Sequence, residues 1–355
     1  MADNTDSKLK ILKQKVEKAE VLWRERLEKI GSKVKKNSGK GLSILNGIVG
    51  DYLAEKGVAI AVQMAFYLNQ KPLKLTKERF KKAYPKATGK ICILVHGLGC
   101  NESVWELEGN QLTTYASMLA DDLGYTPMYV RYNTGLHISH NGQMLSQMLS
   151  ELVAVYPVQI DEIILINHSM GGLVARSACF YGESEKKQWI DKIRQLYFIG
   201  SPHLGAHLEK FGNVVSNALR AAPLPYTRFV GDIIDTRSAG IKDLRYGYVR
   251  DEDWEGQDPD DLLHNNKQTT PLLENAEHFV ITGTVHKDSN HILSQLFGDA
   301  LVSKNSATGQ SKHQKHNLPF LPEHHREFTR IHHVRLAHSL EIYSQIKAWV
   351  AAKPN

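Results

Sequence analysis

The stretch ILINHSMGGLVAR, residues 164–176, decides the fold of this chain. Its first part is continuously apolar, and the part after Ser169 carries small and apolar residues typical of a helix packed closely on a sheet. The pattern therefore predicts a buried strand that turns sharply into a helix, with Ser169 at the turn. A serine in such a turn is usually part of the pattern G-x-S-x-G, but Asn167 holds the place of the first glycine. Since asparagine adopts unusual backbone angles more readily than most residues, we predict that its side chain turns away from Ser169 or hydrogen-bonds nearby backbone.

Other short apolar runs along the chain resemble the one before Ser169. Each has the length of a strand and is too apolar to have a face in water, and predicted helices such as residues 111–123 and 143–156 lie between several of them. Alternation of this kind predicts an α/β fold with a mostly parallel, doubly wound sheet and helices on both faces. The predicted strands are residues 90–97, 126–133, 161–168, 194–201, 278–285 and 326–332.

The first 87 residues differ from the rest in charge and in periodicity, and we expect them to form a helical, basic N-terminal extension to a domain of residues 88–355. Residues 7–35 carry apolar side chains at steps of three and four, and a second helical stretch is expected near residues 42–68. Such a helical hairpin would pack on the main domain or on a second subunit, giving a homo-oligomer. A basic amphipathic helix also suits peripheral contact with an anionic membrane surface.

Composition narrows the class of protein further. The 355 residues are 42% hydrophobic and carry a formal net charge of +6, much of it in the N-terminal extension, so a nucleic-acid partner is not expected. The start of the chain lacks the apolar core of a secretory signal, and the three cysteines have no disulfide-framework spacing. We therefore expect a cytoplasmic protein whose thiols are reduced.

Polar residues follow the predicted strands at the end of the sheet where ligands bind in such folds. Ser169, Asp299 and His333 occur there in the chain order Ser, Asp, His. A serine hydroxyl needs a base to become a nucleophile, a histidine suits that task near neutral pH, and a carboxylate orients the histidine. These three residues are the predicted catalytic triad of an acyl-transfer reaction that needs no cofactor.

Two backbone N–H groups are expected to stabilise the negative charge that develops on an attacked carbonyl oxygen. They belong to Met170, at the start of the helix after Ser169, and to Leu98, in the loop that follows the first apolar run. His96, His168 and His203 lie beside these loops and are candidates for the substrate pocket, with bracing of the loops as the alternative role.

Some alternatives remain open from the residues alone. Asp288 is a reserve candidate for the acid, and His332 competes with His333 for the role of base. The C-terminal third is rich in histidine, but its spacing fits no zinc-site template, so no metal is expected.

Several ordered motifs resemble a known family. They are ILVHGLG (93–99), NHSMGGLVARSA (167–178), GSPHLGAHLEKFGN (200–213), RSAGIKDLRYG (237–247), GDALV (298–302) and HHVRLAHSLEIYSQIKAWV (332–350). Together they look like the bacterial lipase/esterase branch of the α/β-hydrolase superfamily, which is related to triacylglycerol lipases and to GPI inositol-deacylase-like hydrolases. The resemblance implies a serine hydrolase acting on a small ester or lipid, supports Ser169 and Asp299 as triad members, and aligns the family's histidine with His333. Ala300 departs from the glycine that often follows the aspartate.

One region interrupts the alternation of strands and helices. Residues 207–275 contain no clear buried strand, and such a long insertion between core strands is usually a lid or a binding loop. The sequence thus predicts an esterase or lipase with a lid-like insertion. The alternatives are a thioesterase or acyltransferase that uses the same triad, and a non-catalytic binding protein of the same fold.

Overall fold

The computed structural model describes residues 62–108, 110, 112–206, 238–256, 266–284, 302, 304–311 and 314–352. Its strands are β1 (Ala65–Leu68), β2 (Lys71–Pro72), β3 (Lys90–Val95), β4 (Thr126–Arg131), β5 (Glu162–His168), β6 (Ile193–Ile199), β7 (Glu277–Thr284) and β8 (His325–Thr329). Its α-helices are α3 (Lys77–Ala83), α4 (Tyr115–Leu123), α5 (Ile138–Val155), α6 (Met170–Ser184), α9 (Ala239–Tyr246), α10 (Asp251–Trp254), α12 (Lys304–Ala307) and α13 (Leu340–Ala351).

The described strands form one eight-stranded sheet in the order β2-β1-β4-β3-β5-β6-β7-β8. Strands β3 to β8 pair in parallel, whereas β1 runs antiparallel to β4 and to β2. All six apolar runs identified in the sequence form strands of this parallel part. The prediction of a mostly parallel α/β sheet is therefore confirmed.

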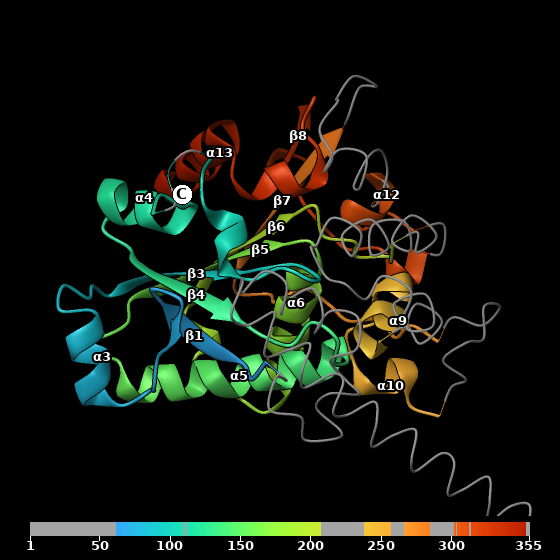
Figure 1. Ribbon diagram of the computed structural model, residues 1–355. Coiled ribbons are helices and arrows are strands. Elements are labelled where there is room, and N and C mark those ends of the chain that lie inside the picture. The colour runs from blue at the N-terminus through green and yellow to red at the C-terminus, as the bar shows by residue number, and fades with distance from the viewer. Residues whose placement is uncertain are drawn as a thin grey trace, which may run out of the picture.

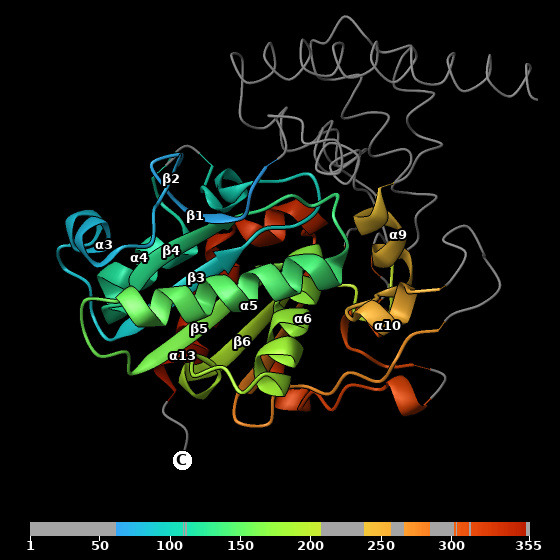
Figure 2. The ribbon, with the colours of Figure 1, turned by 90° about the horizontal axis from the view of Figure 1, so that it is seen from below.

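Helices cover both faces of the sheet, as Figures 1 and 2 show. Helices α3, α5 and α6 lie on one face, where alternate residues of the strands, such as Ile93 and Val95, pack against them. Helices α4 and α13 lie on the other face, against Cys92 and Leu94. This alternation explains why the strands are apolar throughout: each of their two faces is buried.

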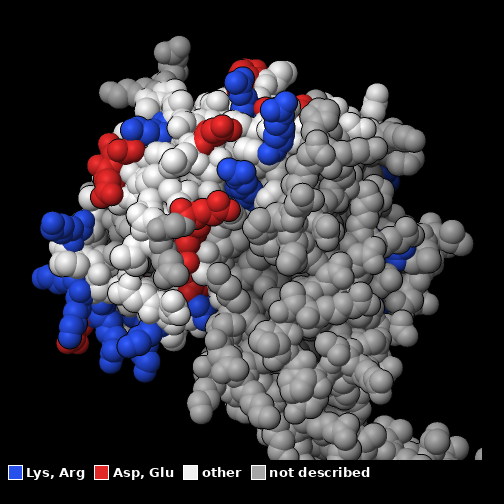
Figure 3. Space-filling view, turned by 45° about the horizontal axis from the view of Figure 1, so that its top comes forward, with Lys and Arg blue, Asp and Glu red and all other residues white. Residues whose placement is uncertain are grey.

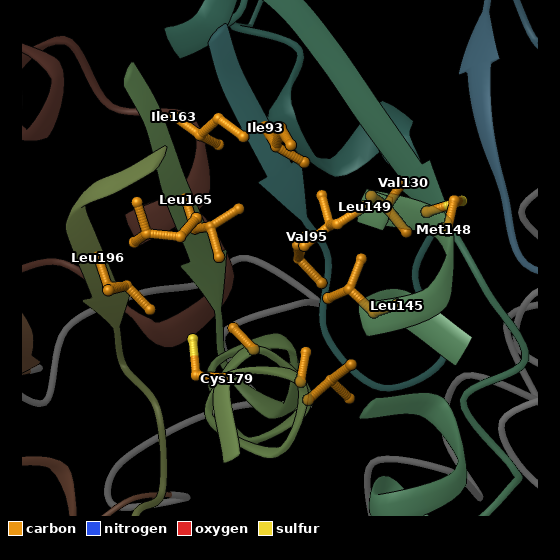
Figure 4. Packing of buried hydrophobic residues seen from close by; sticks show 14 of the residues in the cluster. Ile93, Val95, Val130, Leu145, Met148, Leu149, Ile163, Leu165, Cys179 and Leu196 are labelled. Carbon is orange, nitrogen blue, oxygen red and sulfur yellow. The ribbon is translucent and has the colours of Figure 1, made fainter. Parts of the chain in front are cut away.

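The packing on the α5–α6 face is shown in Figure 4. Side chains of β3, β4, β5 and β6 point from the sheet toward the two helices, and Leu145, Met148 and Leu149 of α5 meet Val95 and its neighbours there. Cys179 of α6 is buried in the same layer. A packed layer of this kind fixes the start of α6, and with it the position of Ser169.

The sheet edge departs from the expected helical extension. Residues 65–68 form strand β1, so the expectation of helix up to residue 68 is wrong at its end. Phe66 of β1 is fully buried in the core, and pairing with β4 satisfies the backbone hydrogen-bonding groups of this strand. With four residues, β1 is too short for an alternation of apolar and polar residues to be recognised in the sequence. Residues 1–61 lie outside the described residues, so a helical hairpin and its packing on a second subunit stay predictions.

The described helices also bear on how the chain meets a membrane. None of them combines the length and the apolar character that crossing a bilayer requires.

Candidate active site

Ser169 lies in a strained turn between β5 and α6. Its backbone angles are φ 54° and ψ −124°, a left-handed conformation that costs a non-glycine residue about 1–3 kcal/mol. Two backbone hydrogen bonds hold it: the N–H of Ser169 donates to Ile199 O at 2.9 Å, and that of Gly172 donates to Ser169 O at 3.0 Å. Strain maintained in this way is typical of a serine presented at the top of a sheet.

Close backbone contacts surround the turn and explain its small residues. A β-carbon added to Gly171 would lie 2.5 Å from Val95 O and 2.6 Å from His96 O, so α6 starts in direct contact with the end of β3. A β-carbon on Gly97 would lie 2.9 Å from the β-carbon of Ser169. The loop after β3 therefore reaches the serine because both Gly97 and Gly171 lack a side chain.

Asn167 is accommodated without an unusual backbone. It lies within β5 and its φ is not positive, so the tolerance of asparagine for left-handed angles is not used. Its side-chain amide donates to Leu165 O at 3.2 Å and to Tyr197 O at 3.1 Å. The prediction that this side chain hydrogen-bonds nearby backbone is confirmed, and the bond to Tyr197 ties β5 to β6.

The two predicted oxyanion donors belong to residues that follow two neighbouring positions, Gly97 and Ser169. Leu98 follows Gly97, and Met170 is the first residue of α6; neither N–H donates to another described residue. The loop that carries Leu98 is braced from the segment after β4, since Tyr132 donates to His96 O at 2.8 Å and Gly99 N–H donates to Thr134 at 3.1 Å. Fixed donors at a helix start favour negative charge at this point.

His333 begins a short 3-10 helix, η5 (His333–Ala337), and its ring lies beside Gly200 and 4.9 Å from the ring of His168, the residue before Ser169. A β-carbon on Gly200 would be 3.0 Å from the ring of His333, and Gly200 follows Ile199, the residue whose carbonyl holds the Ser169 N–H. Burial, together with the nearby His168 and His332, lowers the pKa of His333 well below its usual range. The imidazole is therefore neutral at neutral pH and able to accept a proton.

His168 and His96 brace the loops around the serine. The Nε2–H of His168 donates to His333 O at 3.0 Å, and the two rings lie 4.9 Å apart. The Nδ1–H of His96 donates to Gly97 O at 2.9 Å, while its ring stacks on Tyr132 at 4.5 Å. Burial lowers the pKa of His168 to about 4 and that of His96 to about 3, so both are neutral at neutral pH. Their role as pocket residues stays a prediction.

The insertion between β6 and β7 reaches the site in its described part. Residues 238–256 carry α9 and α10, and a β-carbon on Gly240 would lie 3.1 Å from the terminal methyl carbon of Met170. The carboxylate of Asp243 anchors this part by accepting from Ile138 N–H at 2.8 Å and from His137. Residues 207–237 and 257–265 lie outside the described residues, as do Asp299, Asp288 and Ala300.

Two buried basic residues near His203 were not predicted from the sequence, whereas His203 itself was a candidate for the substrate pocket. The structure places Arg176 of α6 and Lys267 close to His203, all of them buried. Arginine and lysine look like surface residues in a sequence, so no local signal identifies them.

No cluster of three or more His, Cys, Asp or Glu side chains suited to a metal ion occurs within the described ranges. The described groups around the Ser169 turn include neutral imidazoles and backbone N–H groups. Such a set suits acyl transfer.

A sheet of this order, with a serine in a strained strand-to-helix turn at its carboxyl end, defines the α/β-hydrolase fold. Residues 85–222 match the family model described as "Putative serine esterase (DUF676)". Over these residues the chain is similar to that serine esterase family, as the motifs around Ser169 predicted.

Solved structures of esterases and lipases resemble the chain at low identity. The mature lipase BlEst2 of Bacillus licheniformis is 16% identical, with 74% of this chain and 92% of that chain covered and a TM-score of 0.45. The esterase Pf2001 of Pyrococcus furiosus is 17% identical, with coverages of 75% and 82% and a TM-score of 0.41. RedJ, a thioesterase of Streptomyces coelicolor, is 15% identical, with coverages of 75% and 91% and a TM-score of 0.42. No curated protein matches the chain.

Proposed function

We propose that this protein hydrolyses carboxylic esters through a covalent acyl-enzyme formed on Ser169. The observation that carries the proposal is the strained backbone of Ser169 at the start of α6, with Gly97 packed against it. A left-handed serine is retained at a cost in stability, which is typical of a functional site. The serine esterase family match over residues 85–222 supports the same chemistry.

In the proposed first step, the Ser169 hydroxyl oxygen attacks the ester carbonyl carbon while His333 takes the hydroxyl proton. The carbonyl oxygen becomes negatively charged and accepts from the N–H groups of Leu98 and Met170. When the tetrahedral intermediate collapses, the carbon–oxygen bond to the alcohol breaks and His333 returns the proton to the leaving alcohol. Asp299 is the proposed carboxylate that orients His333 throughout.

In the second step, water attacks the acyl carbon and gives a proton to His333. The bond to the Ser169 oxygen then breaks, the carboxylic acid leaves and the proton returns to Ser169. Oxygen and proton balance without a cofactor. Its lowered pKa leaves His333 neutral and free to accept the proton, and the proposed Asp299 would stabilise the imidazolium that then forms.

The insertion of residues 207–275 is the proposed cap over the acyl chain. Its described part contacts Met170 through Gly240, so it lies beside an oxyanion donor and at the edge of the reaction site. A cap in this position would set which acyl lengths reach Ser169.

The proposed substrate is a small ester or a lipid, and contact with a lipid surface through the basic N-terminal segment stays a proposal. Figure 3 shows Lys and Arg side chains gathered at one edge of the molecule. In the described part of the segment, α3 leads into the start of β3, so these side chains lie at the opposite end of the sheet from Ser169. The exposed ones are Lys71, Lys74, Lys77, Arg79, Lys81, Lys82 and Lys86.

Hydrolysis of p-nitrophenyl esters of increasing acyl length tests the proposal. We expect turnover of short or medium chains by the full chain, a loss of at least about 10³-fold in Ser169→Ala, and retention in the control Ser177→Ala, whose serine lies on the same helix. Equal turnover by wild type and Ser169→Ala would refute the assignment.

Rates measured on matched thiol esters and on ester emulsions define the type of hydrolase more closely. Faster turnover of thiol esters would assign the same acyl-enzyme to a thioesterase. A jump in rate above the solubility limit of the substrate would indicate a lipase, and no jump an esterase. Absence of any acyl transfer by the wild type would favour a binding protein of this fold.

A further inference from the structure

Arg176 lies two turns along α6 from Ser169. Its guanidinium is buried, and some of its N–H donors lack a hydrogen-bond partner among the described residues. It is 4% exposed, and its Nη2–H donates to Thr270 O at 2.7 Å. Its Nε and Nη1 are buried and make no hydrogen bond with the residues that the structure describes. Burying an ionised group with unsatisfied donors is among the most costly arrangements in a protein core, so a partner for these two nitrogens is expected.

Further unpaired polar atoms lie in the same region. His203 is fully buried beside Phe198 and Phe320, at ring distances of 4.7 and 5.1 Å, and within the described ranges neither ring nitrogen makes a hydrogen bond. The hydroxyl of Thr270, whose carbonyl oxygen accepts from Arg176, is also buried and has no hydrogen-bond partner in the described part of the chain. Donors from α6, from the loop after β6 and from the segment before β7 thus remain unsatisfied together.

A second buried basic side chain, Lys267, lies near Arg176. Buried Lys267 donates to the carbonyl oxygens of His203 and Tyr246, and burial together with the charge of Arg176 lowers its pKa to about 7. The charge of Arg176 also contributes to lowering the pKa of His203. These mutual effects place Arg176, Lys267 and His203 within electrostatic range of one another.

One carboxylate faces the two cations. Asp253 lies within range of Arg176 and Lys267, but its oxygens accept from three backbone N–H groups, those of Val249 (2.8 Å), Arg250 (3.0 Å) and Gln268 (2.6 Å). Its hydrogen-bonding capacity is therefore directed to the backbone. Among the described residues one carboxylate thus faces two cations, and a water molecule that accepts from Arg176 would add no negative charge.

We propose that Arg176, His203 and Thr270 form a buried site for one small monovalent anion, a halide or a simple carboxylate. The anion accepts from the idle nitrogens of Arg176, from the hydroxyl of Thr270 and from a ring N–H of His203. Arg176 lies seven positions after Ser169 along α6, about 10 Å along the helix axis, so the site is distinct from the reaction site. Its occupancy ties α6 to the loop after β6 and to the segment before β7.

Thermal unfolding of the full-length protein tests this site. At constant ionic strength, replacing sodium gluconate with sodium chloride or sodium formate should raise the Tm saturably, by about 3 °C or more, because gluconate is too large to enter. Chloride acting without formate identifies a halide site, and a larger effect of formate identifies a carboxylate site. Equal Tm values in all three salts would overturn the proposal.

Variants locate the effect. Arg176→Gln should lose the anion-dependent rise, and Thr270→Val should shift it to higher anion concentration. Arg194→Gln, which removes an exposed arginine at the start of β6, should keep it. An undiminished anion-specific rise in folded Arg176→Gln would overturn the assignment.

Crystals of the wild type soaked in sodium bromide give a test that does not depend on the folding of a variant. The proposal predicts an anomalous bromide peak within hydrogen-bond distance of Arg176 Nε or Nη1. If soaks in bromide and in formate both leave only water at this place, the proposal is wrong.

Discussion

The neutral, buried His168 makes the stability of the protein depend on pH in a way that one substitution can isolate. His168 is 2% exposed, and burial lowers its pKa to about 4, whereas an unfolded chain has a histidine pKa near 6.5. Below pH 6.5 the unfolded state therefore takes up a proton that the folded state does not. This contribution to stability is complete above about pH 6.5 and is lost as the pH falls toward 4.

The expected magnitude follows from the two pKa values. Between pH 7 and pH 5, the differential protonation of His168 alone should lower the free energy of unfolding by about 2 kcal/mol. In His168→Gln, the amide can still donate to the carbonyl oxygen of His333, but nothing titrates at this position. The other buried histidines contribute equally to the variant and the wild type, so the difference between the two slopes reports His168.

Urea denaturation followed by circular dichroism at pH 7, 6 and 5 measures the effect. We expect the wild type to lose about 2 kcal/mol more than His168→Gln over this range. The control is His140→Gln, because the side chain of His140 is 47% exposed. Parallel pH dependences of wild type and His168→Gln would refute a depressed pKa at His168.

Three further substitutions test the architecture of the site. Asn167→Gly should leave the rate of ester hydrolysis within about threefold of wild type. It should lower the free energy of unfolding by about 1–2 kcal/mol, because two buried hydrogen bonds are lost. Loss of hydrolysis in this variant would contradict the prediction. Gly171→Ala should destabilise by about 1–3 kcal/mol and lower the rate, since its β-carbon would press on the end of β3; unchanged urea midpoint and rate would show that the contact is unimportant. His333→Ala should lower kcat by at least about 10³-fold while His332→Ala stays active, and the reverse result would move the base by one place.

The parallel sheet was predictable because strands that are buried on both faces are apolar at nearly every position in the sequence. Strands such as β3 are apolar at successive positions, with Ile93 facing α5 and α6 and Leu94 facing α4 and α13. A run of this length and composition has few alternatives to a central strand. The edge strand β1 has no comparable apolar run, because its four residues are stabilised by pairing with β4.

Helix α5 shows how tertiary contact overrides local pattern. It begins at Ile138, five residues before the expected start, in a polar stretch that contains Gly142. A β-carbon on Gly142 would lie 2.1 Å from the hydroxyl oxygen of Ser177, so the glycine permits a close crossing of α5 and α6. A glycine that weakens a helix locally is here required by its neighbour, which the sequence alone does not reveal.

The candidate site was partly accessible to sequence reasoning. Ser169 and His333 were predicted as site residues because each follows a strand at the carboxyl end of the sheet, and parallel strands bring such positions together. The group around Arg176 was not, because it assembles from α6, the loop after β6 and the segment near Lys267, and nothing in their separate patterns links them. Asp299 lies outside the described residues and stays a prediction.

Covalent capture of the nucleophile tests the central claim most directly. Diethyl p-nitrophenyl phosphate should react with the wild type to release one equivalent of p-nitrophenol and leave one diethylphosphoryl group, which peptide mass spectrometry locates on Ser169. Ser169→Ala should remain unmodified, and Ser177→Ala should react like the wild type. An adduct on another residue, with Ser169 unmodified in a protein that still hydrolyses esters, would contradict the account.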